Sequence, residues 1–147
     1  MSLKDVLMQD LKTAMKEKDA IKKSTITMIR AAIKQYEVDN RKEVDDEIVI
    51  DIIAKQLKQK RDAIEEFKKG GREDLVKEAQ TEIEILLNYL PKQLSEDEIK
   101  EIVKEIIDKV GAKGPKDMGK VMGALMPKVK GRADGKLVSK IVKEILS

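Results

Sequence analysis

Apolar residues recur every three or four positions along almost the whole chain, the spacing that places them on one face of an α-helix. The strict alternation typical of strands is absent, and aromatic residues, which strands favour, make up only 2% of the chain. Cap residues, glycines and prolines divide the pattern into seven predicted helices. The second is expected to bury one face, formed by Ile21, Thr25, Met28, Ile29, Ala32, Ile33 and Tyr36.

Local start and stop signals predict where the helices begin and end. Ser2 and Asp19 are typical N-cap residues for the first two helices, and the polar stretch 38–44 predicts a loop after them. Gly70-Gly71 is expected to end a long third helix. Pro127 is expected at the end of the short sixth helix, because proline disrupts the helical hydrogen bonds.

Pro91 is the strongest break in the first two-thirds of the chain. Shortly after it, Ser95 and Glu98 have the spacing of a capping box that opens the fifth helix. The sequence therefore predicts an all-α protein of two parts. These are an N-terminal four-helix domain over residues 1–90, a linker over 91–94 and a small C-terminal three-helix bundle over 95–147.

The composition excludes many kinds of catalytic site. The chain has no His and no Cys, so it has no imidazole base, no thiolate nucleophile and no zinc ligands of either type. Its many carboxylates follow the pattern of solvated helix faces, so no catalytic residue, metal or cofactor is predicted. No apolar run could span a membrane, and the charged N-terminus lacks the apolar core of a signal peptide. We therefore expect a cytoplasmic protein without a membrane partner.

Positive charge is concentrated in the last quarter of the chain. Residues 1–94 carry 19 basic and 19 acidic side chains, whereas residues 111–147 carry nine basic and three acidic ones. A basic surface of this kind is typical of proteins that bind nucleic-acid phosphates. The alternative is a lysine-rich face that keeps a small domain soluble. This region has no aromatic residue to stack on bases, so any RNA would be recognised by backbone and shape.

Four short motifs in a fixed order resemble those of the YqeY family of small bacterial proteins. The resemblance extends over essentially the whole chain. The motifs are Gly71-Arg72-Glu73-Asp74-Leu75, the segment Tyr89–Leu94 followed by Ser95–Glu98, the segment Asp117–Gly123, and Lys130-Gly131-Arg132-Ala133-Asp134-Gly135.

The resemblance also implies a function. The family's C-terminal part is similar to the tail domain of the B subunit of the glutamyl/aspartyl-tRNA amidotransferase, a domain that contacts tRNA. The resemblance thereby implies carbon–nitrogen ligase activity with glutamine as amido donor, although the catalytic modules of that enzyme have no counterpart in this chain. The leading hypothesis is a non-catalytic protein that binds tRNA or another structured RNA. The alternatives are a protein-interaction adaptor that binds no RNA and a genuine amido-transfer enzyme. The expected RNA-binding residues are Lys120, Lys128, Lys130, Gly131, Arg132, Gly135, Lys136 and Lys140.

Overall fold

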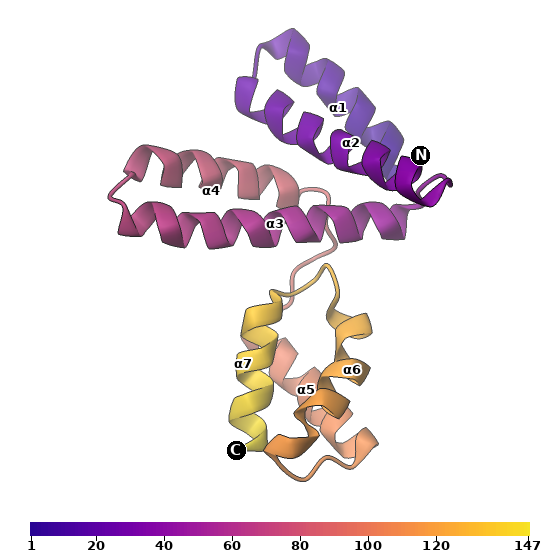
Figure 1. The fold of residues 1–147 in the computed structure, drawn as a ribbon, viewed down its shortest axis with the longest axis vertical. Helices are drawn as coiled ribbons and strands as arrows, with labels where there is room; N and C mark the ends of the chain where they lie inside the picture. Colours follow the sequence, from indigo (N-terminus) through magenta and orange to yellow (C-terminus); the bar gives the residue numbers. More distant parts are fainter. The chain divides into compact units, whose positions relative to one another are not determined.

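The computed structural model describes residues 1–147 and contains α-helices but no β-strand (Figure 1). The prediction of an all-α fold with seven α-helices is confirmed, and a 3₁₀ helix, η1, is added between the fifth and sixth. The chain forms two compact units, Met1–Leu90 and Pro91–Ser147. The helices are α1 (Leu3–Glu17), α2 (Ala20–Asn40), α3 (Asp46–Lys69), α4 (Glu73–Leu87), α5 (Glu96–Val110), η1 (Pro115–Asp117), α6 (Met118–Val129) and α7 (Gly135–Leu146).

The first unit consists of two helical hairpins, α1–α2 and α3–α4, and α2 packs against both helices of the second hairpin (Figure 1). A half-buried ion pair between Lys60 and Glu82 links α3 to α4. The Tyr89 hydroxyl donates a hydrogen bond of 2.5 Å to a carboxylate oxygen of Asp10, which ties the segment after α4 to α1. The apolar core of this unit contains a cluster of Leu7, Ile26, Ile29, Ile33, Val49, Ile53, Leu57, Leu86 and Tyr89.

Two details of the first unit differ from the sequence prediction. The helix α2 continues through Val38 to Asn40, so the first residues of the predicted loop are helical, and Arg41 ends the helix in left-handed geometry with φ 51°. Met28, predicted on the buried face, is 48% exposed, and Ile26 is buried instead. The packing of α2 on two neighbours rotates its buried face, a result that a one-dimensional pattern does not contain.

The second unit is a three-helix bundle. The buried faces of α5, α6 and α7 form its core. Ser95 and Glu98 form the expected capping box at the start of α5. Pro127 lies inside α6 rather than at its end, because the helix runs on to Val129, whose side chain is fully buried. The buried residues are Ile99, Val103, Ile106, Val121, Leu125, Val129, Val138, Ile141, Val142 and Leu146.

Candidate nucleic-acid interface

The connection between α6 and α7 carries the densest group of predicted site residues. It spans residues 130–134, and Gly131 adopts φ 75°, a left-handed conformation that L side chains rarely occupy. The amides of Lys130 and Arg132 donate to the carbonyl oxygens of Met126 and Val129, each at 2.9 Å. Because these two loop amides already donate the hydrogen bonds that end α6, an anion at this loop would be contacted mainly by side chains.

A short segment before α5 holds this connection in place. The Gln93 side-chain amide donates to the carbonyl oxygen of Gly131 at 2.8 Å, and the amide of Leu94 donates to that of Arg132, also at 2.8 Å. The Leu94 side chain packs against the core of the second unit. The carbonyl oxygens of Gly131 and Arg132 thus accept hydrogen bonds from within the second unit. Residues 93 and 94, which the sequence assigns to a linker, are structural parts of this bundle.

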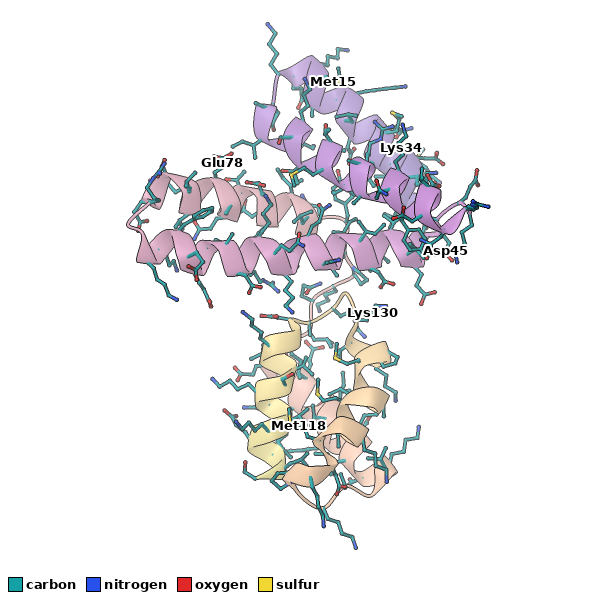
Figure 2. The ribbon with its side chains drawn as sticks, viewed as in Figure 1. Met15, Lys34, Asp45, Glu78, Met118 and Lys130 are labelled. Atoms are coloured by element: carbon teal, nitrogen blue, oxygen red, sulfur yellow. The ribbon has the colours of Figure 1, made fainter.

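The structure brings together some of the predicted cations and separates others. Lys128, Lys130 and Lys136 are exposed around the α6–α7 connection, and Arg132 is half-buried among them. Figure 2 labels Met118 and Lys130, which stand at the two ends of α6. Lys140 lies about one turn further along α7, since four residues of helix rise about 6 Å. We call Lys128, Lys130, Arg132, Lys136 and Lys140 the loop cations.

Lys120 belongs to a different cluster near the start of α6. It lies eight residues before Lys128, a rise of about 12 Å along the helix. Beside it, a carboxylate oxygen of Asp117 accepts a hydrogen bond of 2.9 Å from the amide of Lys113. That bond lowers the pKa of Asp117, and the charges of Lys120 and Lys116 lower it further, against the opposing effect of burial. Lys120 is therefore close to a carboxylate and is not part of the loop group.

Lys92 is a further cation near the loop, and it is not among the RNA-binding residues expected from the sequence. Hydrogen bonds from Ser95 lower the pKa of Glu98 at the start of α5, against a desolvation effect, and the positive charges of Lys92 and Arg132 lower it further. Lys92 and Arg132 therefore act on the same carboxylate. Only the tertiary arrangement reveals this, because Lys92 is 40 residues away from Arg132 in the sequence.

The two predicted glycines of the loop differ in role. Gly131 is buried and requires its positive φ, so it shapes the connection. Gly135 is the first residue of α7, and a Cβ atom built there would meet no atom within 4 Å. The α7 N-terminus is capped by Asp134, whose carboxylate accepts from the amide of Lys136 at 3.2 Å.

The structure supports none of three other kinds of functional feature as a site: an anion-binding turn at Arg72, a metal site and a membrane span. Arg72 at the start of α4 forms two hydrogen bonds with Asp74, of 3.1 and 3.0 Å, so its guanidinium is already paired. No three potential metal ligands converge. None of the helices combines the length and apolar character that a transmembrane helix requires.

The fold and this surface define a class of protein: a helical chain of two units whose C-terminal three-helix bundle displays basic side chains around one loop. The sequence profile described as "Yqey-like protein" matches residues 4–146. The chain therefore belongs to the YqeY family, and the resemblance drawn from its motifs is confirmed.

Curated relatives are similar to part of the chain. A protein of Kluyveromyces lactis named "Altered inheritance of mitochondria protein 41, mitochondrial" is 45% identical over 84 residues, which cover 56% of this chain and 45% of the relative. Proteins of the same name from Lachancea thermotolerans and Saccharomyces cerevisiae are 44% identical over 85 residues and 37% identical over 86 residues. These matches cover 57% and 58% of this chain and 46% of each relative. The matched segment thus spans about half the length of these relatives.

The names of these relatives contradict the expected location and bear on two further expectations, the bacterial origin and the catalytic activity. The relatives are named as mitochondrial, which contradicts the expected cytoplasmic location. The absence of a secretory signal core does not bear on mitochondrial import, because import into mitochondria uses amphipathic segments instead. The relatives are yeast proteins, so the bacterial assignment was too narrow. The names of the family and of the relatives state no catalytic activity.

Proposed function

We propose that this chain binds structured RNA, most of all tRNA, through the loop cations and without catalysing a reaction alone. The observation that carries the proposal is their clustering. Four of the five surround a connection whose backbone is fixed by Gln93 and Leu94, so the cations are displayed on a rigid support. A rigid support lowers the entropy lost when flexible side chains bind phosphates.

The chemistry of the surface favours recognition of the RNA backbone over recognition of bases. Residues 91–147 contain no Phe, Tyr or Trp, so the second unit has no aromatic platform for an unstacked base. Lys and Arg side chains bind phosphate oxygens without reading sequence. The bound RNA would thus be selected by the spacing of its phosphates, as in a folded RNA with closely approaching strands.

A salt titration of binding between the full chain and labelled tRNA tests the proposal. If all five loop cations contact phosphates, the logarithm of the affinity should fall against the logarithm of salt with a slope of about −3.5 to −4.5. A duplex RNA of matched charge serves as competitor, and we expect it to displace tRNA only weakly. Absence of binding at low salt would refute the proposal.

A charge-reversal variant locates the interface. Replacing Lys130, Arg132 and Lys136 by Glu should weaken tRNA binding at least about 10-fold and make the salt slope shallower, because three phosphate contacts are lost. The matched control reverses three other lysines of the same unit, Lys104→Glu, Lys109→Glu and Lys143→Glu, with the same change in net charge. Equal weakening by both variants would show that net charge, and not this surface, governs binding. Circular dichroism checks that each variant keeps its helices.

A further inference from the structure

A hollow of the first unit lies between α1 and α2, and the proposed RNA-binding function does not use it. It has a volume of about 660 Å³. On α2 its lining extends from Thr27 to Glu37, a helical rise of about 15 Å, which makes the hollow a groove along the helix. The remaining lining residues are Lys4, Asp5, Leu7, Met8, Arg30, Ala31, Ile33 and Lys34.

The floor of the groove is apolar and its rim is exposed. Leu7 and Ile33 are 0% and 4% exposed, so they form a packed base. Met8 is 37% exposed, and Ala31 is also exposed along the rim. A small molecule in such an open groove would keep much of its surface in water, whereas ligand pockets normally enclose most of a small ligand. A helix that buries one face and leaves the other in water fits an open groove better.

Some charged side chains of the groove are paired with an opposite charge and others are not. At one end the Lys4 ammonium and the Glu37 carboxylate form an ion pair of 2.9 Å, and this hydrogen bond is the largest cause of the lowered pKa of Glu37. Asp5 is part of the capping box of α1. The side chains of Arg30 and Lys34, one turn apart on α2, take part in no hydrogen bond or ion pair of the structure. Figure 2 shows Lys34 on α2 in the first unit.

We propose that this groove binds an acidic amphipathic helix of a partner protein. Its apolar face would lie on Leu7, Ile33 and Met8, and its carboxylates would pair with Arg30 and Lys34. A methionine at the rim suits this role, since its flexible, polarisable side chain adapts to different apolar surfaces. An RNA backbone fits less well, because it brings no apolar face to cover the floor of the groove.

The helix α5 of this chain is acidic at its start, but it is poorly suited to bind in the groove. The helix α5 has three acidic residues in its first turn, but its apolar side chains Ile99, Val103 and Ile106 are buried in the second unit. It could offer its apolar face to the groove only by unfolding that unit. The inference is independent of the RNA-binding proposal, since it concerns residues 4–37 and not the loop cations.

The test uses a displayed library of helices of about 14 residues, selected for binding to the full chain. Every member has apolar residues at positions i, i+3, i+4 and i+7. The members form three classes, which carry Glu, Lys or Gln at the flanking positions. We expect Glu-bearing helices to be enriched and their affinity to fall as salt is added. Absence of enrichment, or enrichment of the Lys or Gln class, would overturn the proposal.

Variants then locate the site of the selected helices. Arg30→Glu with Lys34→Glu should weaken their binding at least about 10-fold, since two attractive pairs become repulsive. The control, Lys58→Glu with Lys77→Glu, makes the same change in net charge at exposed positions of α3 and α4 and should leave affinity within about twofold. Equal effects of both pairs would refute a site in the groove.

A second variant separates groove binding from general attraction of charge. Met8→Lys adds a positive charge at the rim but replaces an apolar contact. Binding in the groove should weaken, whereas a purely electrostatic association would strengthen. Thermal unfolding checks that the variants are folded, and tRNA binding by all of them should match that of the unaltered chain. Loss of tRNA binding by the Arg30 and Lys34 variant would instead assign this surface to RNA and overturn the proposal.

Discussion

The hydrogen bond between Tyr89 and Asp10 provides a direct test of what holds the first unit together. The Tyr89 ring is buried, with 9% of the residue exposed, and its hydroxyl lies 2.5 Å from a carboxylate oxygen of Asp10. Tyr89→Phe removes this bond but keeps the ring, so no cavity contributes to the change in stability. A hydrogen bond to a charged group contributes about 1.5–3 kcal/mol. Because Asp10 is only half-buried, water can replace the hydroxyl, and we expect a loss of about 1–2 kcal/mol.

Urea denaturation followed by tyrosine fluorescence measures this loss. The chain has two tyrosines and no tryptophan, and both Tyr36 and Tyr89 lie in the first unit, so the signal reports that unit alone. With a slope near 2 kcal/mol per molar urea, the expected loss shifts the midpoint by about 0.5–1 M. The control is Tyr36→Phe, since the Tyr36 hydroxyl makes no hydrogen bond in the structure.

A double-mutant cycle assigns the effect to the pair. Combining Tyr89→Phe with Asp10→Ala should give a coupling energy of about 1–2 kcal/mol, because either single change already breaks the bond. Additive losses would refute the reasoning, and so would a Tyr89→Phe variant within about 0.5 kcal/mol of the unaltered protein. In either case the packing of the ring, and not the hydrogen bond, would be what stabilises this junction.

Two further predictions concern pH and the loop between α6 and α7. Burial, and then the hydrogen bond and charge of Asp10, raise the pKa of Tyr89. Its contribution to stability should therefore be complete below the unfolded pKa of about 10 and be lost as pH rises further, so the stability difference from Tyr89→Phe should shrink above pH 10 in urea titrations. In thermal unfolding, Gly131→Ala should cost about 1–2 kcal/mol because Gly131 has φ 75°, whereas Gly135→Ala should be neutral or slightly stabilising. Equal effects of the two alanines would contradict the assigned roles.

Much of the local structure could be predicted because its causes lie within a few residues. Ser2, Asp19 and Ser95 accept hydrogen bonds from amides three residues on, so the first, second and fifth helices begin where the cap residues indicate. Gly111 ends α5 in left-handed geometry, as a glycine after an apolar stripe predicts. These signals need no knowledge of the rest of the chain.

The errors occurred where packing outweighed a local signal. Pro127 would normally end a helix, but α6 continues because Val129 is fully buried in the core. The carbonyl that Pro127 leaves without a partner is that of Gly123, an exposed residue that water can reach. At the end of α2, Asn40 donates a side-chain hydrogen bond to the Tyr36 carbonyl, which supports a turn that the polar sequence did not indicate.

The candidate interface was predictable in composition but not in arrangement. Counting charges shows that residues 111–147 are basic. It does not show that Lys120 lies beside Asp117 or that Lys92 shares the neighbourhood of Arg132. The first proximity is local, since three residues separate Asp117 from Lys120, but the second depends on how the chain folds back on itself, since 40 residues separate Lys92 from Arg132. A charge count has no information about either distance.

The sequence by itself determined the helices, their caps, the excess of positive charge near the C-terminus and the family. These follow from residue spacing and side-chain chemistry, which act over one or two helical turns. The tertiary structure decided that Gln93 and Leu94 fix the α6–α7 connection, and that α1 and α2 leave a groove with Arg30 and Lys34 on its rim. Both depend on contacts between residues 33 to 38 positions apart, which only the packing of helices brings within reach.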